Sequence, residues 1–158
     1  MTDLIATVLP DDDAPPAALI VNDGFFPDVD PAAFREQLRV RESVTDPRAR
    51  EALIAAIMGV GRDLATWSVT QRASGHTRLA DVPAPKIDGT SRLELLYRRA
   101  VFTLAKAELV ERYRDVELTP RGDRKAEDLD PSVSELRRDS LYAIRDMLDV
   151  TRVAVELI

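Results

Sequence analysis

The residue types that most often carry catalytic chemistry are sparse in this chain. Its 158 residues include one histidine, His76, and no cysteine. Zinc sites need several nitrogen or sulfur ligands, and nucleophilic triads need a histidine beside a serine or cysteine. The sequence therefore predicts no catalytic, metal or cofactor site. An enzyme that works through carboxylates alone is a minor alternative, which a pocket of clustered acids would reveal.

Two short motifs resemble binding sites but have simpler structural interpretations. Asp28 and Asp30 could bind a cation, but the glycine and distant glutamate of a calcium loop are missing. Asp30 directly before a proline is typical of a helix start. Gly59 and Gly61 lie inside a helical pattern and not after a strand, so they do not form a phosphate-binding loop.

The formal net charge of -6 is unevenly distributed. Residues 1–34 contain seven acids and no base, which leaves 21 acids against 22 Lys and Arg, or +1, in the rest of the chain. DNA phosphates would repel the acidic arm at low salt, so a protein that grips nucleic acid is not favoured. No apolar run approaches the ~18 residues of a membrane span. The lack of cysteine fits a reducing compartment, and we expect a cytosolic protein in the cell that makes it.

Hydrophobic periodicity predicts a mainly α fold. Asp30-Pro31 predicts the start of a first short helix. Asp46-Pro47 predicts a much longer second helix that ends at Gly75. Its two mid-helix glycines predict close approach of another backbone. Its apolar seam consists of Leu53, Ile57, Val60, Leu64 and Trp67.

Two further helices are predicted later in the chain. Ser91 and Glu94 match a capping box for the third helix, and Asp130-Pro131 predicts the start of the last one. We expect the seams of the second and third helices to pack antiparallel, with Leu64 and Leu104 deeply buried. The seam of the third helix is Leu93, Leu96, Tyr97, Ala100, Val101 and Leu104. The inward residues of the last helix are Val133, Leu136, Ala143, Ile144 and Met147.

Short β-strands are expected near both termini. Residues 18–21 form a short apolar run, and residues 151–158 alternate apolar and polar side chains, with Val153, Val155 and Leu157 on one side. A lone strand leaves half its backbone groups unpaired, so the two strands are expected to pair, within one chain or between subunits. The predicted organisation is an extended acidic arm, residues 1–24, followed by a single helical domain, residues 25–158.

A long connector separates the second and third helices. The stretch TRLADVPAPKIDGTS has two prolines, an Ile-Asp-Gly turn signal and no helical period. Helices in bundles are usually joined by about two to eight residues. A slim helical subunit cannot bury all three of Leu79, Val82 and Ile87. Residues 77–89 are therefore predicted to be an ordered loop that contacts the adjacent subunit or another protein. A loop that only wraps its own helices is the alternative.

A second function is left open by the segment VELTPRGD, residues 116–123. It faintly resembles the strand and turn of a winged helix, but the preceding segment, residues 105–114, mixes basic and acidic side chains. The alternative function is therefore a helical DNA-binding regulator. The arginine pairs at 98–99 and 137–138 are expected on solvated faces, with ion pairs between helices or subunits as the other possibility.

Seven stretches together, in order from about residue 25 to the C-terminus, resemble the head completion proteins (gpL type) of peduovirus-like tailed phages. These stretches are Phe25-Phe26-Pro27-Asp28-Val29-Asp30-Pro31; Thr77-Arg78-Leu79-Ala80-Asp81-Val82-Pro83-Ala84; Ile87-Asp88-Gly89 with Ser91; Tyr97 with Arg99-Ala100-Val101; Glu111-Arg112-Tyr113-Arg114; Gly122-Asp123 with Lys125-Ala126; and Arg138-Asp139.

The resemblance implies a structural virion protein, not an enzyme, that acts as a head–tail connector adaptor. Such a protein binds the portal protein after the terminase has packaged DNA. It forms a ring of about twelve subunits that continues the DNA tunnel, and it offers a platform to the tail completion and tail terminator proteins. DNA would be passing cargo only, and assembly would take place in the host cytoplasm. The residues expected to contact the portal or a neighbouring subunit are Phe26, Pro27, Asp28, Thr77, Arg78, Leu79, Asp81, Val82, Pro83, Ile87, Asp88, Arg112, Tyr113, Val153, Val155 and Leu157.

Overall fold

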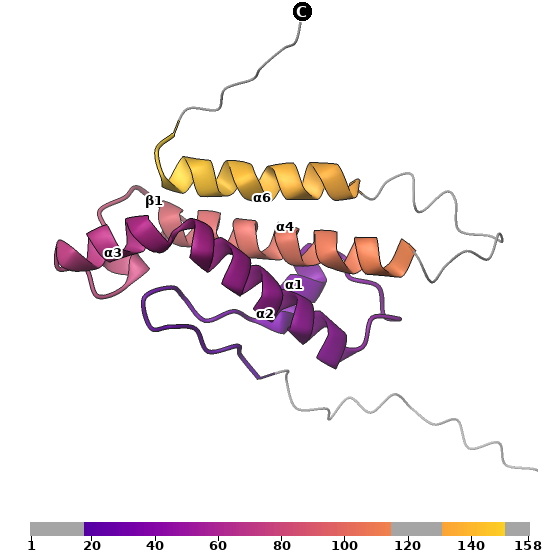
Figure 1. Cartoon of the computed structure of the whole chain (residues 1–158). Helices are drawn as coiled ribbons and strands as arrows, with labels where there is room; N and C mark the ends of the chain where they lie inside the picture. Colours follow the sequence, from indigo (N-terminus) through magenta and orange to yellow (C-terminus); the bar gives the residue numbers. More distant parts are fainter. Residues whose placement is uncertain (1–17, 115–130, 151–158) are drawn as a thin grey trace, which may run out of the picture.

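The computed structural model describes residues 18–114 and 131–150 (Figure 1). The fold is mainly α, as predicted. The expected C-terminal strand and the winged-helix-like segment lie outside the described residues. The described elements are α1 (Pro31–Gln37), α2 (Asp46–Asp63), α3 (Ala65–Ala73), the 3-10 turn η1 (Leu79–Asp81), β1 (Lys86–Ile87), β2 (Thr90–Ser91), α4 (Arg92–Arg114) and α6 (Val133–Met147).

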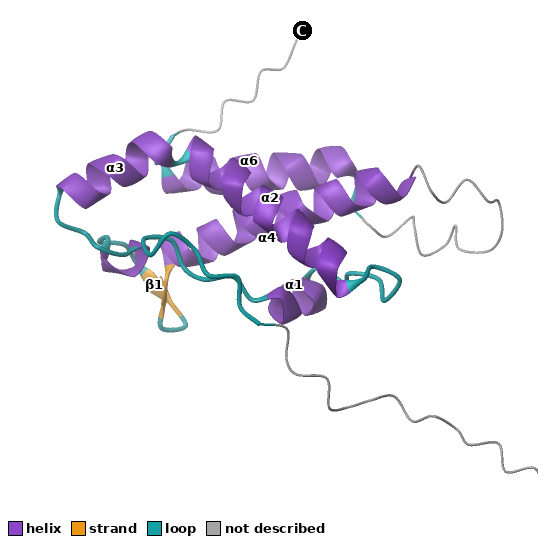
Figure 2. Ribbon diagram, turned by 60° about the horizontal axis from the view of Figure 1, so that its bottom comes forward, coloured by secondary structure: helices purple, strands orange, loops and turns teal. Residues whose placement is uncertain are grey.

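Helix α4 forms the centre of the bundle (Figures 1 and 2). Helix α6 runs antiparallel along one side of it, where the Ser140 hydroxyl donates to the Ala100 carbonyl at 2.9 Å. Helix α2 crosses the other side, also antiparallel as predicted, and Gly59 faces Leu104 there. Alanines 100, 105 and 107 of α4 are fully buried. These small side chains let both neighbouring helices approach closely.

The expected long second helix is two helices. It breaks at Leu64, which ends α2 and precedes α3, and the axes of α2 and α3 differ by 65°. Leu64 is fully buried, and the bend directs Trp67 toward the Phe25 ring, with 6.3 Å between the ring centroids. Gly75, with φ +95°, follows the end of α3 as predicted. Among the described residues no single helix is both long and apolar enough to cross a membrane.

The helix starts differ in detail from the sequence patterns. Asp30 caps α1 as predicted, since its carboxylate accepts the N–H two residues on at 2.8 Å. Helix α2 begins at Asp46 itself, so this residue lies in the first turn and not at the cap. Helix α6 begins at Val133, later than the Asp-Pro signal suggests, because Ser132 and Glu135 form a complete capping box.

Three packing expectations need correction. A side chain on Gly59 would meet Leu104 Cδ2 at 3.3 Å, so its close neighbour is a side chain and not a backbone. Gly61 would meet nothing within 4 Å, and the expected close approach there is wrong. Leu104 is only partly buried and packs at the edge of the core, beside α2.

The N-terminal apolar run makes one isolated β-bridge. Ile20 and Val29 exchange backbone hydrogen bonds of 2.8 and 3.0 Å. The partner of this run in the structure is therefore a nearby segment of the same chain. Pairing by residues 151–158 stays a prediction, because those residues lie outside the described part of the chain.

Replacing Leu64 with Ala tests the buried bend. We expect the free energy of unfolding to fall by about 2–5 kcal/mol, because the substitution leaves a cavity in a fully buried site. Val69→Ala, at an exposed position of α3, should change it by less than about 0.5 kcal/mol. Urea unfolding followed by circular dichroism measures both, and equal losses in the two variants would contradict this packing.

Candidate interaction surfaces

The connector is anchored by its apolar residues. Leu79 and Val82 are buried in the core, and the Leu79 N–H donates to the Phe25 carbonyl at 2.8 Å. The turn η1 directs these two side chains inward, so they are not the free contact residues that the sequence suggested. For them the alternative is correct: the loop packs on its own helices. Pro83 beside them is exposed.

Thr77, Arg78 and Asp81 form an exposed corner beside the buried side chains of the turn. The Arg78 guanidinium forms two hydrogen bonds to the Asp81 carboxylate, at 3.0 and 3.3 Å, and the Thr77 hydroxyl donates to the same group at 3.1 Å. The hydrogen bond from Arg78 is the main reason that the pKa of Asp81 lies below its usual range. This part of the predicted contact set therefore has a defined shape before any partner binds.

The hairpin β1–β2 is the most protruding feature of the connector (Figure 2). Asp88 and Gly89 form its two-residue turn, with φ of 50° and 74°, which is typical of a type I′ turn. Lys86 pairs with Ser91 and Ile87 with Thr90 across the ladder. Ile87 is 58% exposed. An aliphatic side chain is thus held out in solvent by a tight turn.

The Phe-Phe-Pro-Asp motif contributes more to the core than to the surface. Phe25 and Phe26 are buried, and Phe26 stacks on Tyr97 with 4.6 Å between ring centroids. Phe26 is therefore a core residue, in contrast to the expectation. Pro27 is half-buried, and only Asp28 is exposed, where its carboxylate accepts the N–H of residue 22 at 2.9 Å.

Residues 18–24, which the sequence assigned to the acidic arm, also pack on the helices. The Asn22 side chain donates to the Tyr97 hydroxyl oxygen at 2.8 Å. Asp23 accepts the N–H groups of Phe25 and Phe26 and pairs with Arg72 at 2.5 Å. Burial raises the pKa of Tyr97 to about 12. This segment is fastened to α3 and α4 by polar contacts that no sequence pattern indicated.

The arginines of α4 and α6 make ion pairs within the chain. Arg112 pairs with Glu108 at 2.7 Å and lies 3.7 Å from Glu51 of α2. Between α4 and α6, Arg99 pairs with Asp139 at 3.3 Å and the residue-137 guanidinium with the residue-111 carboxylate at 2.5 Å. Ion pairs between helices, one of the two interpretations left open, are therefore present. The side chains of Tyr113, Val153, Val155 and Leu157 lie outside what the structure describes.

The packing of α4 argues against the winged-helix alternative, in which this helix would bind DNA. A recognition helix must present a free face to the DNA groove. Lys106 is buried instead, and its amine donates to the Arg39 carbonyl at 3.4 Å. Of the segment 105–114, residues 105–107 and 109 are buried, and only residues 111 and 112 of its described side chains are exposed. This segment cannot enter a major groove without unpacking the bundle.

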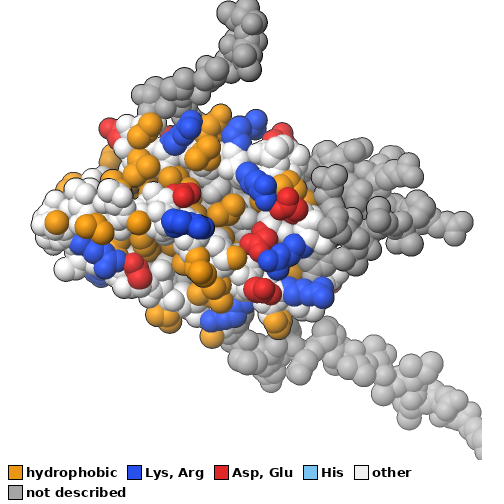
Figure 3. Space-filling model, viewed as in Figure 1, with side chains coloured by type: hydrophobic (Ala, Val, Ile, Leu, Met, Phe, Trp, Pro, Cys, Tyr) orange, Lys and Arg blue, Asp and Glu red, His pale blue; other side chains and the backbone are white. Residues whose placement is uncertain are grey.

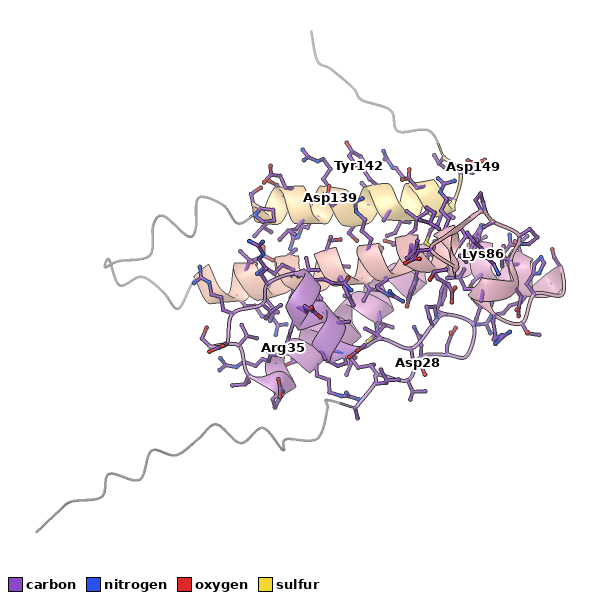
Figure 4. All side chains as sticks on the ribbon, turned by 180° about the vertical axis from the view of Figure 1, so that it is seen from behind. Asp28, Arg35, Lys86, Asp139, Tyr142 and Asp149 are labelled. Atoms are coloured by element: carbon purple, nitrogen blue, oxygen red, sulfur yellow. The ribbon has the colours of Figure 1, made fainter. Side chains whose placement is uncertain are left out.

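Sequence reasoning missed a shallow groove of about 340 Å³ between α4 and α6. Asp139 and Tyr142 of α6 contribute to it (Figure 4). Its lining mixes charged and aliphatic side chains from two helices, and no local sequence pattern brings such residues together. In the described ranges no three His, Cys, Asp or Glu residues cluster as a metal site.

The comparisons with known proteins found one family and two relatives that match this chain. The profile of the family "Phage head completion protein (GPL)" matches residues 20–158. The chain belongs to the phage head completion protein family. Head completion proteins are structural components of the virion, and the family is not one of enzymes.

Two relatives show how far the similarity extends. The head completion/stabilization protein of Escherichia phage P2 is 42% identical over 126 residues, which cover 80% of this chain and 75% of the relative. The probable head completion/stabilization protein of Haemophilus phage HP1 is 30% identical over 140 residues, 89% of this chain and 92% of the relative. No solved structure matches the chain.

The raised pKa of Tyr97 predicts a loss of stability at high pH. The unfolded phenol ionises from its ordinary pKa of 10.0, whereas the buried one stays neutral up to about 12. The buried neutral phenol therefore contributes fully to the free energy of unfolding below pH 10, and this contribution is lost between pH 10 and pH 12. Between pH 9 and pH 11, wild type should lose about 1 kcal/mol more unfolding free energy than Tyr97→Phe. Denaturant titrations at both pH values measure this difference, and parallel losses would show that Tyr97 is not protected.

Proposed function

We propose that this protein is a head–tail connector adaptor. It binds the portal after DNA packaging, forms a ring of about twelve subunits that continues the DNA tunnel, and provides the platform for tail completion and tail terminator proteins. Membership of the phage head completion protein family carries this proposal, since both relatives are named for head completion and stabilization. The portal, the ring and the tail platform are the finer parts of the proposal.

The surface charges support a conduit for DNA better than a DNA-binding protein. A cationic tunnel wall would hold phosphates through counterion release and impede sliding. Six of the described arginines are paired with a carboxylate within the chain. The paired residues are Arg35–Asp46, Arg72–Asp23, Arg78–Asp81, Arg99–Asp139, Arg112–Glu108 and Arg137–Glu111.

The exposed members of the contact set are candidates for the portal or the neighbouring subunit. They gather in two places, the Thr77–Arg78–Asp81 corner and the hairpin that carries Ile87. Both are held by internal hydrogen bonds, so docking would cost little ordering of the backbone. Asp28, Pro83 and Arg112 are further exposed positions of this set. Val153, Val155 and Leu157 stay part of the proposed contact set as sequence predictions.

Complementation of defective heads tests the proposal. Phage made without the protein should yield DNA-filled heads that do not join tails, and adding the purified full-length protein should restore joining. Electron microscopy of the protein mixed with its portal should show a ring stacked on the portal. The DNA-binding alternative predicts instead a salt-dependent shift of duplex DNA. Such a shift without portal binding or tail joining would overturn the adaptor function.

A further inference from the structure

The outer face of α2 and α3 is exposed, and no other segment of residues 18–114 and 131–150 covers it. We call it the α2–α3 face, and it is centred on Ile54, Met58 and Val69, of which Met58 is 68% and Val69 66% exposed. Figure 3 shows hydrophobic side chains gathered over these two helices. The neighbouring outward positions of α3 are small or uncharged, namely Ala65, Thr66, Thr70 and Ala73. Apolar surface of this kind, with a polar rim, marks interaction sites.

The hairpin β1–β2, with the exposed Ile87, lies on a different side of the molecule. Helix α2 lies in front of α4 in Figure 1, and the tilt to Figure 2 brings the hairpin out on the opposite side of α4. A head-to-tail contact needs two different surfaces on one subunit, and it gives a ring when the rotation between successive subunits closes. An isologous dimer would instead bring two copies of one surface together. The geometry therefore suits a repeated contact between copies.

The charges beside the two surfaces are complementary. Ile87 stands between Lys86 and Asp88 at the hairpin, and Arg62 and Asp63 end α2 one turn beyond Met58. Within the described part of the chain these four charged side chains have no ion-pair partner, whereas six of the other arginines do. If Lys86 of one copy lay opposite Asp63 of the next, and Asp88 opposite Arg62, all four charged groups would have an ion-pair partner. Such charges set register and exclude wrong partners.

We propose that the hairpin of one subunit docks on the α2–α3 face of a second copy of this chain. Ile87 packs between Met58 and Val69, with Lys86 and Asp88 beside Asp63 and Arg62. This inference rests on the proposed function, because a ring of copies requires a repeated head-to-tail contact. The tight Asp88-Gly89 turn holds the hairpin ready, which lowers the entropy lost on docking.

A charge exchange across the contact tests the pairing. Asp63→Lys and Lys86→Asp should each weaken self-association of the full-length protein about two- to five-fold per contact, which corresponds to an exposed ion pair. The double variant, with the charges exchanged, should recover association, because each contact again joins opposite charges. Arg138→Glu, at an exposed position of α6, is the control and should not weaken it. A double variant weaker than either single variant would overturn the pairing.

Cysteine cross-linking in completed heads tests the geometry, and the chain has no native cysteine to interfere. The double variant Met58→Cys/Ile87→Cys should give a ladder of disulfide-linked oligomers under oxidation. Mixed single variants should give dimers only, and Ile87→Cys alone should stay monomeric. Leu141→Cys, on α6, is the exposed apolar control.

The outcomes separate this inference from the adaptor function. Variant protein present in active heads without a 58–87 cross-link would overturn the docking while the adaptor function stands. Disulfide dimers of Ile87→Cys alone would indicate a two-fold contact and would also overturn it. Wild-type protein absent from completed heads would refute the adaptor function and the inference together.

Discussion

Burial of α4 on nearly all sides is the constraint on which the structure depends. A helix enclosed by two antiparallel neighbours needs small residues where the axes approach, and Ala100, Ala105 and Ala107 supply them. Its polar groups also need partners inside the bundle. Ser140 therefore donates to a carbonyl of α4, and Lys106 donates to the Arg39 carbonyl. In the described chain no buried side-chain polar atom lacks a hydrogen bond.

Two irregular segments cover the parts of the helical core that α2 and α6 leave exposed. The N-terminal segment places Phe25 and Phe26 against α3 and α4, and η1 places Leu79 beneath them. The backbone bond from Leu79 to Phe25 joins these two segments, which are far apart in sequence. The long connector is thus partly a core element. Only its charged corner and its hairpin remain available to a partner.

Sequence patterns predicted the individual helices better than the contacts between segments that are distant in the chain. The cap at Asp30, Gly75 and four of the five inward residues of α6 were correct because caps and periodicity are local properties, whereas Val133 is only half-buried. The break at Leu64 was missed because the apolar spacing continues across it with no proline to mark it. The burial of Leu79 and Phe26 was missed because it depends on contacts between distant segments. The α4–α6 groove and the Asn22–Tyr97 bond depend on such contacts as well.

The ion pairs within the chain also influence which partners its surface can bind. Where an arginine already has a carboxylate partner, it adds little attraction toward DNA or toward a random protein surface, since its field is compensated at short range. Recognition can then depend on charged groups without such partners, among them Lys86, Asp88, Arg62 and Asp63. At the hairpin and at the end of α2 these groups flank apolar side chains, so burial can supply affinity while charge sets register. Because both surfaces belong to one rigid bundle, the angle between successive subunits would be set by the fold itself.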